Sequence, residues 1–286
     1  MKKILVPVDF SPNSTNALYV AADIAQRTGA VLELLHVNLA AAYAAPLSEY
    51  AAAPSGYGMD DEDYEDKVAG QLEKLRLSIM ADPRYSKLSV WTREDEGYLH
   101  SSVRNVAEAD GVDLVVMGTK GSSGMADFLV GSNTEKVIRM APCPVLAVPE
   151  GVTAFDPKVV LLPSTLKKDQ MPAFRCIADL ERSYQFLVKV LYLNNASSLP
   201  TDGEAEATKN RMAKEAGMKK TDVIMTTHTL FEDNAILGAA DMCDADLIVM
   251  ATHQRQGLSH LLFGSITEDT VNHSHIPVLA VPVGLK

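Results

Sequence analysis

An internal repeat constrains this chain more than any other feature of its sequence. It aligns DLVVMGTKGSSGMADFLVGSNTEKVIRMAPCPVLAVPEG, beginning at Asp113, without gaps to DLIVMATHQRQGLSHLLFGSITEDTVNHSHIPVLAVPVG, beginning at Asp246, and about 18 of 39 positions are identical. A weaker match upstream pairs ILVPVDFS at Ile4 with VLLPSTLK at Val160. The repeated unit is therefore a whole domain, and a chain of 286 residues has room for two.

Short apolar runs alternate with helical patterns inside each repeat. Runs rich in Val, Ile and Leu are typical of strands buried on both faces of a parallel sheet, and apolar residues at helical spacing fill the gaps. This order predicts an α/β fold of two tandem open parallel five-stranded sheets, with helices on both faces. We expect strands at 3–8, 31–37, 87–91, 113–117 and 144–148, then at 158–163, 185–193, 221–226, 246–250 and 277–281, and first-repeat helices at 14–27, 64–80 and 98–109.

The repeat also predicts the domain boundaries. We expect a first repeat at residues 1–150, a linker at 151–157 with the sequence GVTAFDP, and a second repeat at 158–286. Residues 39–60 have no counterpart of similar length in the second repeat and are interpreted as an insertion. Their Ala, Tyr, Pro and Gly content fits a mobile surface loop, or a lid over a nearby ligand.

Charge and cysteine content narrow the classes of function. The formal net charge is −11, which argues against a nucleic-acid footprint because that needs a clustered basic face. Three cysteines that lie far apart, without a CxxC pair, predict neither a disulfide framework nor a thiolate metal site. The short apolar start, broken by Pro7 and Asp9, is expected to be neither a signal peptide nor a membrane span. We therefore expect a cytoplasmic protein that holds any anionic ligand locally, through backbone amides.

One glycine-rich stretch is the candidate anion site. MGTKGSSGMADFLVGSNTE begins at Met117, where an apolar strand ends, and ligands of open parallel sheets lie beyond the carboxyl ends of the strands. Its glycines, Gly118 included, are expected to allow positive φ and close approach to a ligand, while residues 131–134 are expected to precede a helix. A helix start with free amides can bind an anion. Without a Walker A or dinucleotide motif, the residues alone leave phosphate binding and a structural turn both open.

The spacing of this stretch resembles a known family. GTKG, nine further residues and then GS, at Gly118, Gly121, Gly131 and Ser132, match the pattern of the ATP-binding members of the universal stress protein family. VPVDFSPNS near the start and PCPVLAVP near the end of the first repeat are also similar to that family's opening and closing segments. The resemblance implies a five-stranded α/β fold, with ATP phosphates on the glycine loop and helix start, and adenosine against the first two strand ends.

The resemblance implies a role in nucleotide binding for ten residues of the first repeat. Asp9 could bond the sugar hydroxyls or help to hold a Mg or Mn ion on the phosphates, and capping the helix near Asn13 is the structural alternative. ADP or AMP could replace ATP. The predicted binding residues are Pro7, Asp9, Val37, Met117, Gly118, Gly121, Gly131, Ser132, Asn133 and Thr134.

The second repeat departs from the pattern at positions that matter. Gly118 is replaced by Ala251, Gly121 by Gln254 and Asp9 by Thr165, so we expect this repeat not to bind ATP in the family's manner. Gly264 and Ser265 are retained and can simply start a helix. Five of the seven histidines lie here, but none forms HxxxH or HExxH, so ordinary histidines are favoured over a metal site.

Three functions remain open from the sequence. The leading hypothesis is an ATP-binding, nucleotide-dependent stress-response sensor or regulator; the alternatives are a slow ATPase or nucleotide hydrolase, and a nucleotide-independent interaction protein. No catalytic set is recognised in the sequence. The resemblance to single-domain members of the family implies dimerisation through the last strand. We therefore expect the two PVLAVP segments, at 144–149 and 277–282, to pair with each other within one chain. A homodimer of chains and the protein partner stay undetermined.

Overall fold

The computed structural model describes residues 1–39, 61–119, 132–193, 202–219, 221–227, 232–253 and 263–284. The interpretation of 39–60 as a loop or lid lies outside these residues, except for Leu39.

The ten strands that the structure describes form one sheet, in the order β3-β2-β1-β4-β5-β10-β9-β6-β7-β8. Each set of five is parallel throughout, which confirms the predicted fold class. The first set is β1 (Lys3–Pro7), β2 (Val31–Asn38), β3 (Val90–Glu96), β4 (Leu114–Gly118) and β5 (Val145–Val148). The second set is β6 (Val159–Ser164), β7 (Leu187–Leu193), β8 (Thr221–Thr227), β9 (Leu247–Thr252) and β10 (Val278–Pro282).

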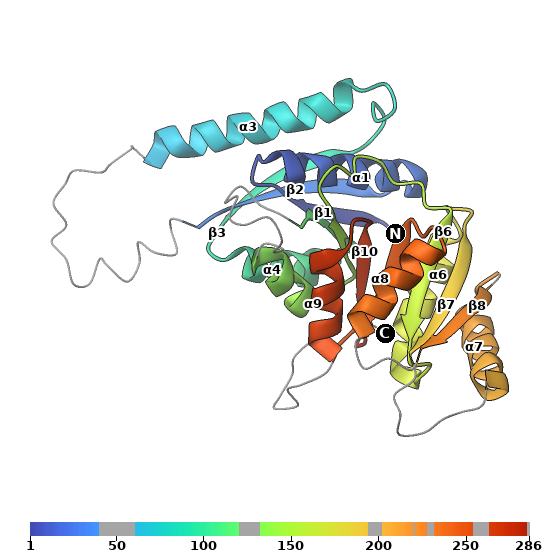
Figure 1. The fold of residues 1–286 in the computed structure, drawn as a ribbon. Coiled ribbons are helices and arrows are strands. Elements are labelled where there is room, and N and C mark those ends of the chain that lie inside the picture. Colours follow the sequence, from blue (N-terminus) through green and yellow to red (C-terminus); the bar gives the residue numbers. More distant parts are fainter. Residues whose placement is uncertain are drawn as a thin grey trace, which may run out of the picture.

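Helices cover both faces of the sheet (Figure 1). One apolar cluster joins the sheet to α1 (Pro12–Thr28), α3 (Asp61–Ala81), α6 (Met171–Leu180) and α7 (Asp202–Ala216). A second cluster, on the opposite face, joins it to α4 (Leu99–Asp110), α5 (Ser132–Met140), α8 (Glu232–Met242) and α9 (Phe263–His273). A 3₁₀ helix, η1 (Lys168–Gln170), precedes α6. Successive side chains of a strand point to opposite faces of the sheet, so each buried strand contributes residues to both clusters.

The third strand differs from its prediction. We expected a strand at 87–91 that is buried on both faces, but β3 runs from Val90 to Glu96 and only Val90 in it is buried. The strand is an outer edge of the sheet and pairs with β2 alone. An edge strand tolerates charged residues, so its sequence VWTREDE lacks the apolar run that marks the central strands.

The two sets of strands meet in an antiparallel pair of β5 and β10. Leu279 lies opposite Leu146, Val278 opposite Ala147 and Ala280 opposite Val145. The predicted pairing of the two PVLAVP segments is therefore confirmed, and it removes two apolar edges that would otherwise be free to pair with other chains.

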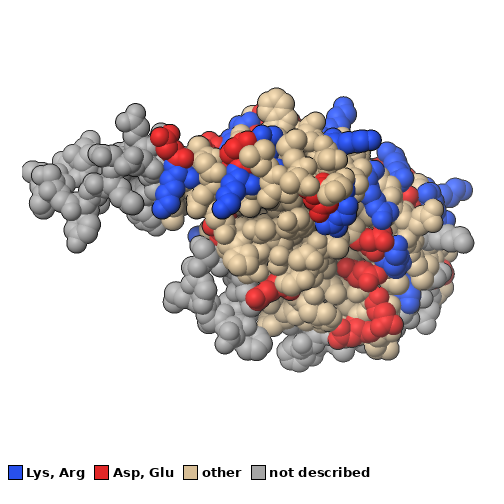
Figure 2. Space-filling view, turned by 90° about the horizontal axis from the view of Figure 1, so that it is seen from above, with Lys and Arg blue, Asp and Glu red and all other residues tan. Residues whose placement is uncertain are grey.

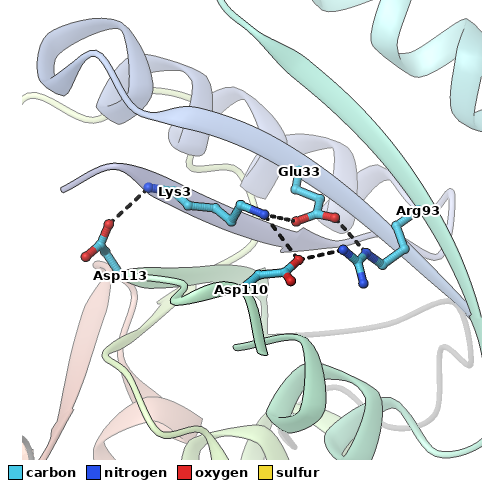
Figure 3. Close-up of polar contacts among 5 residues, drawn as sticks. All are labelled: Lys3, Glu33, Arg93, Asp110 and Asp113. Carbon is cyan, nitrogen blue, oxygen red and sulfur yellow. Dashed lines mark hydrogen bonds and ion pairs between the residues drawn. The ribbon is translucent and has the colours of Figure 1, made fainter. Parts of the chain in front are cut away.

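Polar contacts secure the amino-terminal end of each first strand. Asp113 accepts a hydrogen bond from the Lys3 backbone N–H at 3.0 Å, and Asp246 does the same for Val159 at 2.9 Å. In the first repeat a network extends across the sheet, because Lys3 and Arg93 both contact Glu33 and Asp110 (Figure 3). The aspartate that begins each DL[VI]VM segment thus ties the fourth strand of each set to the first.

Candidate functional site

A crevice site is expected where the strand order reverses. The chain runs outward from β1 through β2 to β3, then crosses to β4 and β5 on the other side of β1. Pro7 ends β1, Gly118 ends its neighbour β4, and Val37 lies near the end of β2. The structure thus brings Pro7, Val37, Met117 and Gly118 to one edge of the sheet, at the topological switch point.

Gly118 is needed for a reason that the sequence did not show. Its φ is not positive, so the expected left-handed turn is wrong at this position. Instead, a Cβ here would lie 2.9 Å from the backbone oxygen of Asn13, in the first turn of α1. Glycine therefore lets the amino end of α1 pack directly on the end of β4.

Asp9 supports the loop that lines this edge. Its Oδ1 accepts a hydrogen bond from the Ser11 backbone N–H at 3.1 Å. Ser11, not Asp9, is the N-cap of α1, because its Oγ accepts from the Ser14 N–H at 3.2 Å. The capping role considered for Asp9 is therefore wrong, and its side chain is exposed, two residues beyond the end of β1 at Pro7.

His36 supports the loop that follows β1, a role that the sequence did not predict. Its Nδ1 lies 2.9 Å from the carbonyl oxygen of Val8, and its ring stacks on Phe10 with centroids 4.8 Å apart. Phe10 has a φ of 62°, which is costly for a residue with a Cβ, so the contact with His36 helps to hold the loop. Leu166, the equivalent residue in the second repeat, also has a positive φ, of 56°, so both repeats retain this turn.

The start of α5 lies beside the end of β4. The helix begins at Ser132, so Ser132, Asn133 and Thr134 lie inside its first turn, where we had expected them to precede it. The Thr134 hydroxyl donates a hydrogen bond to the Gly118 carbonyl at 3.0 Å and is buried. The first backbone N–H groups of a helix have no partner within the helix, so this end offers donors to an anion. Gly121 and Gly131, together with Lys120, lie outside the described residues.

An acidic cleft adjoins the crevice on the side of β2 and β3. Its volume is about 650 Å³, and Asn38 and His36 form its wall nearest to β1. Asp66 of α3 and the carboxylates of β3 supply negative charge, which would repel phosphate. The lining is His36, Asn38, Asp66, Val68, Ala69, Glu94, Asp95 and Glu96.

At the equivalent edge of the second repeat, a pair of side chains lies near the ends of β6 and β9. His253 Nε2 lies 3.1 Å from Asp169 Oδ2, joining the end of β9 to η1. By the repeat, these residues occupy the positions of Lys120 and Asn13. Ala251 stands in the place of Gly118, and Gln254 lies outside the described residues.

The remaining histidines and the cysteines have varied surroundings. Within the described ranges, no group of three or more His, Cys, Asp or Glu side chains could hold a metal ion. His273 contacts the Asp269 carbonyl and His275 lies near Asp241, while His228 and His260 are outside the described residues. The three cysteines are free, and burial raises the pKa of Cys143 and of Cys176 to about 12.

Two surface observations bear on partners. The face that carries α1 and α3 shows side chains of both charge signs and no single basic patch (Figure 2). Among the helices that the structure describes, none is long and apolar enough to cross a membrane.

The fold and crevice define a duplicated, Rossmann-like α/β protein. The model of the universal stress protein family matches residues 1–149 and again 161–282, so the chain belongs to this family.

Relatives match one repeat or the whole chain. Universal stress protein YxiE of Bacillus subtilis is 28% identical over 150 residues, which are 51% of this chain and 97% of that protein. Universal stress protein Slr1230 of Synechocystis is 24% identical over 301 residues, covering 98% of this chain and 99% of its own. The crystal structure of a universal stress protein from Archaeoglobus fulgidus has a TM-score of 0.73 and 17% identity, and covers 99% of this chain and 98% of its own. That structure supports the fold.

Proposed function

We propose that this chain is a nucleotide-responsive regulator that binds one ATP in the crevice of the first repeat. The phosphates would meet the amino end of α5 and the glycine loop that precedes it. Adenine and ribose would lie against the ends of β1 and β2, near Pro7, Asp9 and Val37. A Mg or Mn ion would accompany the phosphates, and ATP-dependent recognition by another cellular component would carry the stress signal.

The observation that carries the proposal is the convergence of α5 with the switch point of the sheet. The Thr134 hydroxyl donates to the Gly118 carbonyl, so the first-turn N–H groups of α5, which have no partner within the helix, lie beside the end of β4. A helix start supplies a local positive potential that a chain of net charge −11 otherwise lacks. The acidic cleft beyond β2 disfavours phosphate on that side, which supports an orientation with phosphates toward α5 and adenosine toward β2.

The second repeat is proposed not to bind ATP. Thr165 replaces Asp9, and the pair of His253 and Asp169 lies at the equivalent edge of the sheet. Gln254 would place a side chain where phosphates would otherwise lie.

The test is the nucleotide content of the purified chain. Protein is denatured and the released nucleotide is identified by mass spectrometry; calorimetry on nucleotide-free protein then compares ATP, ADP and AMP with and without Mg. We expect one ATP for each chain. Gly121→Gln should abolish binding by imitating the second repeat, and its matched control Gly264→Gln should not. Undiminished affinity in Gly121→Gln would remove the proposed site, and loss in Gly264→Gln alone would reverse the assignment of the repeats.

A further inference from the structure

An ion pair joins the two repeats beside the seam. Arg139 lies in the last turn of α5, and both its Nε and its Nη2 donate to the carboxylate of Glu268 on α9. The Glu268 side chain is only 12% exposed, and that of Arg139 is 31% exposed. Hydrogen bonding to Glu268 raises the pKa of Arg139 above its ordinary value. A bidentate, partly buried pair fixes orientation as well as distance, unlike most surface ion pairs.

The helix that carries Arg139 is the helix that begins at the crevice. Thr134, which holds the end of β4, precedes Arg139 by five residues, so the two contacts are about 7.5 Å apart along the axis at 1.5 Å per residue. A helix of nine residues has little stability of its own, so tertiary contacts determine its position. Between these contacts, Val137 and Ile138 pack into the apolar cluster that also holds Val271 of α9.

The link is asymmetric between the repeats. The repeat aligns Glu135 with Glu268 and Arg139 with Asn272. A symmetric seam would carry two such ion pairs, but Asn272 is neutral and cannot form the second one with Glu135. The retained pair is the one that anchors the helix of the first repeat, where the proposed nucleotide site lies, to the second repeat.

We propose that Glu268 is a positioning residue for the nucleotide site of the first repeat, acting through Arg139 and α5. This rests on the proposed function. The second repeat, which lacks a nucleotide site of its own, thereby sets the affinity of the first. Coupling between sites is reciprocal, so ATP at the start of α5 must in turn stabilise the contact of α5 with α9.

The experiment uses the full chain with ATP and Mg. Calorimetry compares the parent protein with Arg139→Glu, with Glu268→Arg and with the double exchange of charges. Each single variant should bind ATP about tenfold more weakly, and the double variant should recover most of the loss. Arg104→Glu is the control, because it breaks an exposed ion pair between Arg104 and Glu108 that lies within α4 and does not join the two repeats. Glu268→Gln serves if a charge reversal does not fold.

A second measurement needs no variant. Hydrogen exchange of α9 in the parent protein should slow when ATP is added, although ATP is proposed to bind in the other repeat. Three results would each contradict the coupling but not the ATP site. The single variants could bind ATP as tightly as the parent, the double variant could bind it as weakly as the single variants, or hydrogen exchange of α9 could stay the same when ATP is added. A parent protein that binds no ATP would overturn the proposed function, and the positioning role with it.

Discussion

Leu146 of β5 and Leu279 of β10 lie directly opposite each other in the antiparallel seam. They are equivalent residues of the two repeats, and both are almost completely buried in the cluster that α1 and α6 cover. The contact turns two five-stranded sheets into one sheet of ten. Duplication within a chain thus provides each apolar edge strand with a partner of the same sequence at high local concentration.

Placing like charges in this seam should separate the repeats. The double variant Leu146→Asp and Leu279→Asp buries two unpaired carboxylates opposite each other, at a cost of more than about 4 kcal/mol. We expect faster proteolysis within 151–157 and loss of a single cooperative unfolding transition. Leu77→Asp is the control, because Leu77 is exposed on α3. Cleavage and unfolding unchanged from the parent would mean that other contacts hold the repeats together.

Asp23 should prove to be the main attachment of the linker. Its Oδ2 accepts from the Phe155 backbone N–H at 2.9 Å, and its Oδ1 accepts from the Tyr85 hydroxyl at 2.5 Å. Asp23→Ala leaves two donors without their acceptor, and we expect a loss of about 2–4 kcal/mol in the free energy of unfolding together with faster cleavage of 151–157. The matched control is Asp179→Ala, at the equivalent position of α6, where the carboxylate forms an exposed ion pair with Arg182. Equal effects of the two variants would contradict this role.

The network of Lys3, Glu33, Arg93 and Asp110 should make stability depend on pH (Figure 3). A hydrogen bond from Lys3 lowers the pKa of Asp110, so the carboxylate is favoured in the folded state. Its contribution is present above the unfolded pKa of about 3.9 and is lost as the pH falls through the lower folded value. Asp110→Asn should therefore cost about 0.5 kcal/mol at pH 7, because the group is partly solvated, and nothing near pH 2. Urea unfolding at both pH values measures this, and a difference that persists in acid would exclude the charge as its cause.

Periodicity predicted the parts of the fold that depend on burial, and it failed where contacts between distant segments decide. The central strands could be predicted because both their faces are apolar, whereas β3, at the edge, carries VWTREDE and shows no such signal. The turn at Phe10 could not be predicted, because periodicity carries no signal for a positive φ in a residue other than glycine. Gly118 was expected to adopt a positive φ, whereas its close approach to the α1 backbone, which exists only in the folded chain, is what excludes a Cβ there.

The interpretation of Asp9 leads to the most informative prediction about the nucleotide. Asp9→Asn keeps an oxygen that can accept from the Ser11 N–H, so the loop should retain its shape while the charge is lost. If Asp9 bonds the ribose, ATP, ADP and AMP should all bind about tenfold more weakly, with or without Mg. If it helps to hold the divalent ion, only the Mg-dependent part of ATP affinity should fall, and AMP should bind as before. Calorimetry of the three nucleotides at two Mg concentrations separates these results, with Asp169→Asn in the second repeat as the control. Full affinity for all three nucleotides in Asp9→Asn would show that the charge of this carboxylate contributes nothing to nucleotide binding, and that Asp9 supports the loop instead.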